Sequence, residues 1–189
     1  MKVQKSTKTA DKPFFTVGHS TRSLAEFVHL LQAEDIKLVV DVRTVPRSRT
    51  NPQYNKDTLP EDLAAFKIGY RHLTELGGLR SKSKVVPTQE NGFWQNSSFH
   101  NYADYALSED FLQGLDKLIK LGRKKRCAIM CSEAVWWRCH RRIISDYLLA
   151  RGETVFHLMG KDRIEPAHLT AGAKIKSERK IVYPLSKVA

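Results

Sequence analysis

Two short apolar segments separated by a helix-like segment are the feature that most constrains the fold of this chain. Residues 14–17 read FFTV, and residues 37–42 read KLVVDV with a continuous apolar centre. Strands that are buried on both faces of a parallel sheet have such uninterrupted runs. Between the two segments, Leu24, Phe27 and Leu31 recur at helical spacing. The order strand, helix, strand predicts a βαβ unit with a right-handed crossover.

The same alternation continues along the chain. Further strands are predicted over residues 70–73, 127–131 and 154–158, and helices over 59–68, 99–121 (divided near Ser108) and 138–150. Alternating strands and helices are typical of α/β domains. We therefore predict a single α/β domain over residues 13–189, with a mostly parallel sheet of about five strands flanked by helices in rhodanese-like or Rossmann-like layers. Residues 1–12 are predicted to be a disordered basic tail.

The composition of the chain indicates which kinds of partner and which cellular compartment to expect. Lys and Arg exceed Asp and Glu by a formal net charge of +12, which favours an anionic ligand such as a nucleotide or a nucleic acid. No apolar run approaches the roughly 20 residues that cross a bilayer, so no membrane association is expected. Three cysteines do not form a disulfide framework, which favours a reducing cytoplasm. The sequence leaves the oligomeric state open.

Reactive side chains are densest in residues 126–146, RCAIMCSEAVWWRCHRRIISD. Cys131 ends a predicted strand and precedes a predicted basic helix. Ligands of open α/β sheets bind at the carboxyl ends of strands. The positive end of the helix dipole, together with Arg138 and Arg141, would favour a thiolate at this position. Cys131 is therefore a candidate nucleophile, and its structural alternative is a small buried core residue.

The spacing around Cys131 is close to that of two enzyme classes. Rhodanese-type sulfurtransferases and cysteine phosphatases place an arginine shortly after the cysteine, in a loop that cradles an anion. Here six residues separate Cys131 from Arg138, where those families usually have five, and Trp136 and Trp137 make the loop bulky. Asp41-Val42-Arg43 also resembles the rhodanese pattern. A sulfurtransferase with a persulfide on Cys131 is thus one hypothesis.

A metal site is another interpretation of the same segment. Cys131, Glu133, Cys139 and His140 include the usual zinc ligands. The spacing C-x7-C-H matches no standard zinc module, and adjacent residues 139 and 140 of the predicted helix would point to different faces. We therefore expect no metal and no other cofactor.

Charged and titratable residues also follow the other predicted strands. His19 could act as an acid or base, because its ordinary pKa is near neutrality. Asp41 could orient His19 or an arginine, or could simply pair with Arg43. Together with Cys131, the candidate proton-transfer residues are His19, Asp41, Glu133 and His140. The candidate anion-binding residues are Arg43, Arg47, Ser48, Arg138 and Arg141. The alternative for these arginines is a solvated basic rim.

The order of these motifs resembles the family of bacterial and archaeal proteins grouped as domain of unknown function 488, over about residues 14–184. The matching pieces are Gly18-His19-Ser20, Asp41-Val42-Arg43 with Pro46 and Ser48, Tyr70 with Leu76-Gly77-Gly78, Tyr102-Ala103-Asp104-Tyr105, Met130-Cys131-x-Glu133, Arg138-Cys139-His140-Arg141 with Asp146, His168-Leu169-Thr170, Ala173 and Tyr183-Pro184. The resemblance implies a single α/β domain with these motifs around one pocket. It implies no established reaction.

Three functions therefore stand as hypotheses. The first is an enzyme or binding protein that acts on a phosphate-bearing or nucleic-acid ligand in a basic pocket at the carboxyl edge of the sheet. The second is the sulfurtransferase that uses Cys131. The third is a non-catalytic nucleic-acid-binding module, whose affinity would come mainly from contacts of Lys and Arg with phosphates.

Overall fold

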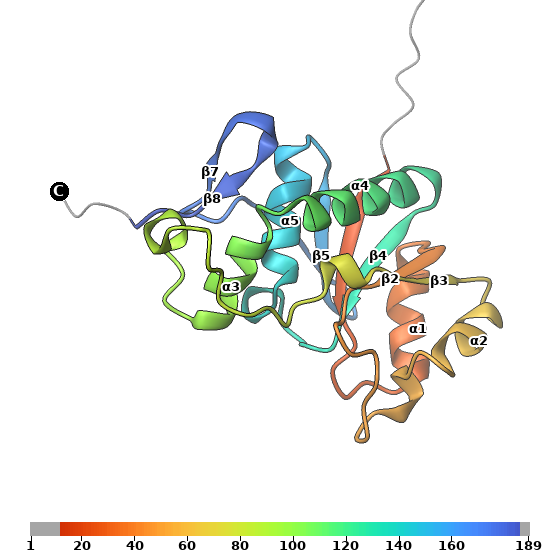
Figure 1. Cartoon of the computed structure of the whole chain (residues 1–189). Helices are drawn as coiled ribbons and strands as arrows, with labels where there is room; N and C mark the ends of the chain where they lie inside the picture. The colour runs from red at the N-terminus through yellow and green to blue at the C-terminus, as the bar shows by residue number, and fades with distance from the viewer. Residues whose placement is uncertain (1–11, 186–189) are drawn as a thin grey trace, which may run out of the picture.

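A six-stranded sheet in the order β3-β2-β4-β1-β5-β6 forms the centre of the computed structural model, which describes residues 12–185 (Figure 1). The strands are β1 Phe14–Gly18, β2 Leu38–Asp41, β3 Gly69–His72, β4 Cys127–Cys131, β5 Val155–Gly160 and β6 Arg163–Pro166. The first five pair in parallel, and β6 is antiparallel to β5. The predicted α/β class and mostly parallel sheet are therefore confirmed, with one strand more than expected.

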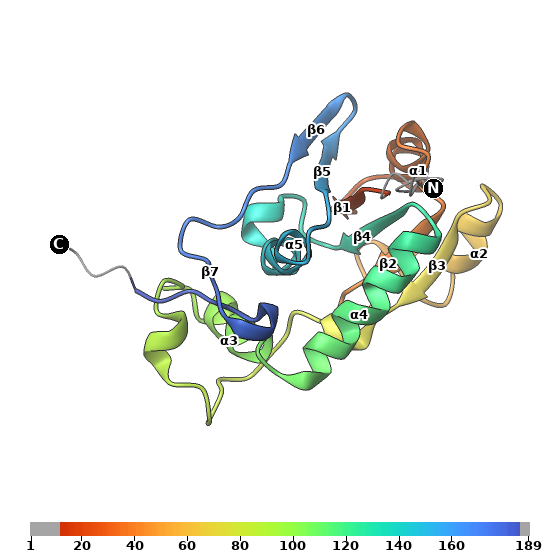
Figure 2. The same cartoon turned by 90° about the horizontal axis from the view of Figure 1, so that it is seen from above.

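In the described part of the chain, five α-helices cover the two faces of this sheet (Figure 2). They are α1 Leu24–Ala33, α2 Leu59–Ala64, α3 Ser97–Tyr105, α4 Glu109–Lys124 and α5 Arg141–Ala150. One apolar cluster joins α1 and α2 to the sheet through residues such as Phe27 and Leu63. A second cluster joins α3, α4 and α5 to the opposite face through Tyr102, Phe111 and Tyr147. The two layers of helices leave the carboxyl edge of the parallel strands accessible.

Local capping fixes the start of α1 beside that edge. The Ser23 hydroxyl accepts a hydrogen bond from the Glu26 amide, and the Glu26 carboxylate accepts one from the Ser23 amide. This reciprocal arrangement is a capping box, and it satisfies two backbone donors at once. Ser23 is therefore the N-cap of α1, and Ser20 lies in the turn between β1 and α1.

Besides shifts in helix bounds, such as the end of α2 at Ala64 instead of residue 68, the structure differs from the sequence prediction in two main places. Residues after 160, whose periodicity is weak, form β6 and a small hairpin of β7 (Lys174–Ile175) and β8 (Ile181–Val182). Helix α5 begins at Arg141 rather than at Arg138, because residues 136–138 form the separate 3-10 turn η4. The predicted disordered tail lies outside the described residues except for Lys12.

No helix in the described part of the chain is both long and apolar enough to cross a bilayer.

Gly18, the last residue of β1, permits the loop after β4 to pass very close to the sheet. A Cβ atom built at Gly18 would lie 1.9 Å from the carbonyl oxygen of Glu133 and 2.9 Å from the Cα atom of Ala134. These neighbours are backbone atoms, so they cannot move aside without displacing the loop. The glycine therefore positions the loop of residues 132–135 over the end of β1.

We predict that Gly18→Ala lowers the free energy of unfolding by about 1–3 kcal/mol, as is usual when a side chain is forced into packed space. Gly160→Ala is the matched control at the end of β5, because a Cβ atom there meets nothing within 4 Å. Urea denaturation of both variants checks this. Equal stabilities would contradict the close packing of the loop on β1.

Candidate functional site

A cavity of about 630 Å³ opens at the carboxyl edge of the parallel strands. The ends of β1, β2 and β4 meet there because β4 pairs with both of the other strands. All of the predicted site residues line this cavity except Asp41 and Arg141, which are fully buried beside it. The N-terminal turn of α3 contributes Ser98 and Phe99 to the wall, and no motif in the sequence predicts their presence there.

Asp41 and Arg43 form a buried ion pair behind the cavity. The Oδ1 atom of Asp41 accepts hydrogen bonds from the backbone amide and the Nε atom of Arg43, both at 3.0 Å. Its Oδ2 atom accepts from Arg43 Nη2 at 2.7 Å and from the Tyr70 hydroxyl at 2.6 Å. Of the roles considered for Asp41, the structure thus shows pairing with Arg43. A carboxylate held by so many donors is an anchor rather than a free base.

Arg43 extends this hydrogen-bond network to His19, which follows β1, and to Tyr54, which precedes α2. Its Nη2 atom also donates to the carbonyl oxygen of Tyr54 at 2.7 Å, and its Nη1 atom lies 3.2 Å from His19 Nε2. The Nδ1 atom of His19 lies 2.9 Å from the Ser20 carbonyl oxygen. Because a carbonyl only accepts, Nδ1 carries the proton and Nε2 accepts from Arg43. The His19 ring stacks on Tyr54, with centroids 4.1 Å apart.

These surroundings keep His19 neutral. The pKa of His19 is lowered to about 4, chiefly by burial. The hydrogen bond with the Ser20 carbonyl raises the pKa in part, and the positive charge of Arg43 opposes that rise. Both ring nitrogens are already hydrogen-bonded. The near-neutral pKa expected for His19 is therefore absent, and its role in this structure is to join β1 to Arg43.

Arg141 is a second buried cation, and its nearest anionic partner is a sulfur atom. Only 1% of this residue is exposed. Its Nε atom donates to Cys139 Sγ at 3.2 Å and its Nη2 atom donates to the Glu133 carbonyl oxygen. Within residues 12–185, no carboxylate forms an ion pair with it. Buried charges are normally paired, so this arrangement favours a thiolate at Cys139.

The pKa values of the two cavity thiols shift in opposite directions. Burial raises the pKa of Cys139, but a hydrogen bond from Cys131 and the charge of Arg141 outweigh burial and lower it to about 6. The hydrogen bond to Cys139, followed by burial, raises the pKa of Cys131 to about 12. These directions favour the thiolate at Cys139, whereas the sequence predicts the activated thiol at Cys131. Arg141 is the first residue of α5 and follows Cys139 by two positions, and its guanidinium donates a hydrogen bond to that sulfur.

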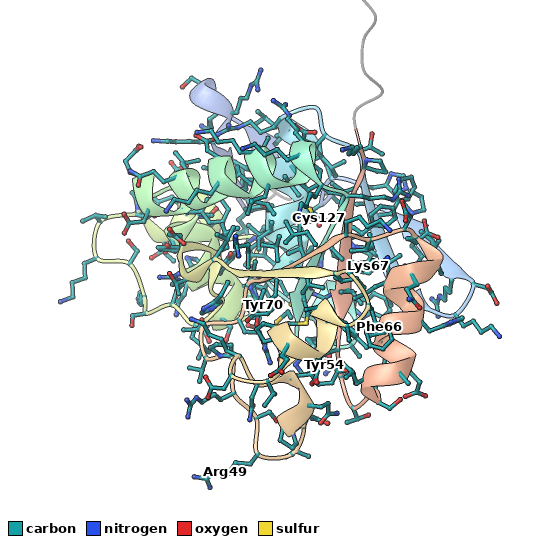
Figure 3. All side chains as sticks on the ribbon, turned by 90° about the vertical axis from the view of Figure 1, so that its right-hand side faces the viewer. Arg49, Tyr54, Phe66, Lys67, Tyr70 and Cys127 are labelled. Atoms are coloured by element: carbon teal, nitrogen blue, oxygen red, sulfur yellow. The ribbon has the colours of Figure 1, made fainter. Side chains whose placement is uncertain are left out.

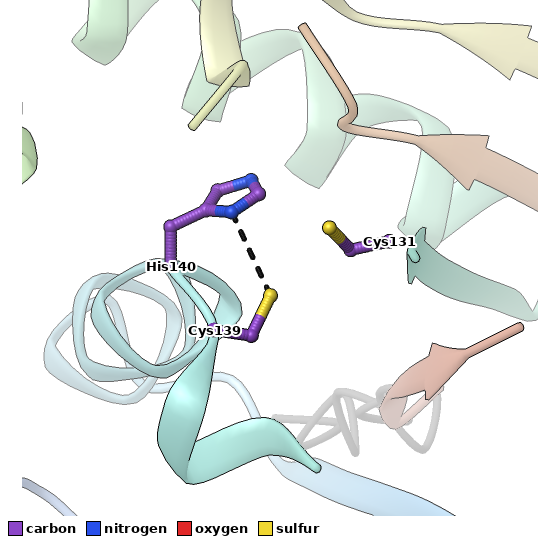
Figure 4. Close-up of side chains that lie close together, drawn as sticks. All are labelled: Cys131, Cys139 and His140. Carbon is purple, nitrogen blue, oxygen red and sulfur yellow. Dashed lines mark hydrogen bonds between the residues drawn. The ribbon is translucent and has the colours of Figure 1, made fainter. Parts of the chain in front are cut away.

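His140 completes a cluster with these two sulfurs (Figure 4). Its Nε2 atom lies 3.0 Å from the Val42 carbonyl oxygen and therefore carries the ring proton. Its Nδ1 atom lies 3.6 Å from Cys139 Sγ. The expectation that residues 139 and 140 diverge on a helix is wrong, because both precede α5 and Cys139 has extended backbone angles. Their side chains consequently turn toward Cys131 at the end of β4.

The remaining cavity residues differ in whether their side chains already form ion pairs or hydrogen bonds. Arg47 pairs with Asp57 at 2.8 Å in an exposed salt bridge, and the Ser48 hydroxyl accepts from the Asn51 amide. Arg138 is exposed, and its guanidinium has no ion pair or hydrogen bond within the described residues. The same holds for the Glu133 carboxylate, which makes Glu133 the least constrained acid or base of the cavity.

We predict that Asp41→Asn lowers the free energy of unfolding by about 3–5 kcal/mol, because it leaves Arg43 buried without its counter-charge. Tyr70→Phe is the matched control, since it removes one hydrogen bond from the same carboxylate and should cost about 1 kcal/mol. Chemical denaturation at pH 7 gives both values. Equal losses in the two variants would show that the charge of Asp41 is not what stabilises this edge.

We also predict a pH dependence that His19 produces. The folded-state pKa of His19 is near 4 and the unfolded value near 6.5, so the unfolded state binds the proton first as the pH falls. Stability is complete above pH 6.5 and declines toward pH 4. The decline between pH 7 and pH 5 should be smaller by about 1 kcal/mol in His19→Gln, after allowance for solvent screening. Identical declines in the two proteins would refute a buried neutral His19.

Comparison with known proteins identifies the family. Residues 23–148 match the family described as domain of unknown function DUF488. No curated protein and no solved structure matches the chain. The matched region includes β2, β3, β4 and nearly all of α5, and it contains every cavity residue discussed above except His19 and Ser20. The chain therefore belongs to the DUF488 family.

Proposed function

We propose that the cavity binds a small phosphate-bearing ligand, such as a nucleotide, and that Arg138 is its principal cation. A volume of about 630 Å³ falls within the range of roughly 300–1,000 Å³ that is usual for small-molecule sites. The carboxyl edge of a parallel sheet is also where ligands of such folds bind. The observation that carries the proposal is the guanidinium of Arg138 in the cavity wall, which has no ion pair or hydrogen bond with any residue from 12 to 185.

The two buried arginines are poor candidates for the ligand-binding cation, because their donors are already engaged within the protein. Arg43 and Arg141 direct their donors to Asp41, Tyr54, Cys139 and Glu133. Because these donors are already engaged, Arg43 and Arg141 maintain the walls of the cavity. Arg138 has all of its donors available, and a guanidinium binds phosphate oxygens in a bidentate manner. The N-terminal turn of α3, where the helix dipole is positive, adds positive potential to the cavity.

Backbone geometry at the end of β1 also supports a ligand site. Ser20 lines the cavity with a φ of 50°, a region that residues other than glycine rarely adopt. Such conformations concentrate at binding sites, where the surrounding structure maintains them. The Ser20 hydroxyl would supply a neutral donor in the same cavity as the Arg138 charge. A concave site of this kind suits a mononucleotide better than a nucleic-acid backbone, which needs an extended basic surface.

A thiol enzyme is the second candidate, and the contact between Arg141 and Cys139 favours it. The guanidinium that stabilises the sulfur is the type of group that activates nucleophilic cysteines. In this candidate the reactive sulfur is Cys139, and Cys131 is its hydrogen-bonded neighbour. Alkylation of chelator-treated protein at pH 7, read by mass spectrometry, should label Cys139 before Cys131. Labelling of Cys131 first would remove this candidate.

We predict that pyrophosphate and adenosine monophosphate raise the melting temperature of the protein, because a ligand that binds only the folded state stabilises it. Arg138→Ala should weaken the affinity derived from this shift about tenfold to a hundredfold, since hydrogen bonds to charged groups contribute about 1.5–3 kcal/mol. The unliganded melting temperature should stay close to that of the wild type.

Arg49→Ala is the matched control for this experiment. Arg49 belongs to the same basic loop as Arg47, but it extends away from the rest of the structure at the tip of that loop and does not line the cavity (Figure 3). Its removal changes the net charge equally and should leave the affinity nearly unchanged. Equal weakening in both variants would indicate a general charge effect and contradict a specific role of Arg138. If the protein instead binds RNA or DNA with a steep dependence on salt, and Arg138→Ala does not change this binding, the nucleic-acid-binding module is favoured.

A further inference from the structure

We propose that Cys131, Cys139 and His140 bind a divalent transition-metal ion, zinc foremost, with its fourth coordination position open to the cavity. One ligand atom from each residue lies within 4.8 Å of the other two. Figure 4 shows the two sulfur atoms and the imidazole turned toward a common point between the end of β4 and the start of α5. This site is independent of the proposed anion binding, because it requires none of the cationic residues.

The distances match tetrahedral coordination. A sulfur at about 2.3 Å and a nitrogen at about 2.05 Å from zinc are roughly 3.6 Å apart at a tetrahedral angle. Cys139 Sγ and His140 Nδ1 are separated by 3.6 Å. Two thiolates on the same ion are roughly 3.8 Å apart. The three ligand atoms lie within 4.8 Å of one another, so each pair is within about 1.2 Å of its coordination distance.

The surroundings of His140 orient it as a metal ligand. Its Nε2 atom donates to the Val42 carbonyl oxygen at 3.0 Å, which leaves the lone pair of Nδ1 directed at the sulfurs. Metal-binding histidines usually donate their other ring N–H to a carbonyl or carboxylate in this way. Gly78 lies against the ring, since a Cβ atom there would be 2.5 Å from Nδ1. Tyr102 packs on it edge-on at 4.9 Å between ring centroids.

Hydrogen bonding and charge also suit an anionic sulfur pair. Arg141 donates to Cys139 Sγ at 3.2 Å from a fully buried position, as groups around metal-bound thiolates do. Two thiolates neutralise a divalent ion. The charge of Arg141 and the nearby charge of Arg138 then remain for an anionic fourth ligand, which would approach from the cavity.

The donor set indicates which ions bind and what the site can do. Two sulfurs and one imidazole suit zinc and exclude the oxygen-preferring ions magnesium and calcium. Three protein ligands with one open position are typical of catalytic zinc sites, whereas structural sites use four. All three ligands line the cavity, so a water molecule or a phosphate oxygen can occupy the fourth position. The site would thus place a Lewis acid beside the proposed anion site.

The test is a cobalt titration of reduced, metal-stripped protein. One equivalent of Co²⁺ should produce a thiolate-to-cobalt charge-transfer band and the visible bands of tetrahedral cobalt, and Zn²⁺ should abolish both. Cys131→Ser and Cys139→Ser should each lose the charge-transfer intensity of one sulfur. His140→Gln should weaken cobalt affinity by at least about tenfold. Arg138→Ala should retain the full spectrum, so that failure of the anion proposal and failure of the metal proposal are distinguishable.

Cys127→Ser is the matched control for the cysteine variants. Cys127 is a buried thiol in the same strand, β4, but it does not belong to the cluster. Its spectrum should equal that of the wild type. Circular dichroism checks that each variant is folded. A second measurement uses only the wild-type protein, in which zinc should protect Cys131 and Cys139 from alkylation. A folded wild-type protein without the charge-transfer band, or with a band that both cluster variants retain, would overturn the proposal.

Discussion

The buried ion pair between Asp41 and Arg43 is the interaction on which the rest of this edge depends. It connects β2 with Tyr70 of β3, with the Tyr54 carbonyl before α2, and with His19 after β1. Each of these segments is a loop or a strand end, and such segments do not hold a fixed position without partners. Because both charges are buried, removing one is far more costly than removing any neutral contact around them. The cavity therefore has a rigid wall on this side.

The opposite wall depends on the second buried cation. Arg141 connects the start of α5 with the loop after β4, through Cys139 and the Glu133 carbonyl oxygen. Gly18 permits that loop to lie against β1. The two buried arginines thus maintain the cavity, whereas Arg138 at its surface is available for a ligand. In the proposed function, this difference between buried and exposed arginines assigns the anion to Arg138 alone among them.

Much of the fold follows from the sequence, and the exceptions have physical causes. Continuous apolar runs marked β1, β2 and β4 because both faces of these strands are buried. Strand β6 was missed because its residues are largely exposed and its order comes from pairing with β5. The start of α5 was placed at Arg138, since helical spacing alone does not reveal the 3-10 turn of Trp136–Arg138. For the same reason, the sequence does not reveal that Cys139 and His140 converge, or that Arg141 contacts the Cys139 sulfur.

A crystal structure of the protein with bound pyrophosphate tests the central claim most directly. We expect the phosphate oxygens inside the cavity, in contact with the Arg138 guanidinium, while Arg43 and Arg141 keep their bonds to Asp41 and Cys139. Pyrophosphate bound outside the cavity, or bound by Arg43 after its separation from Asp41, would contradict the account.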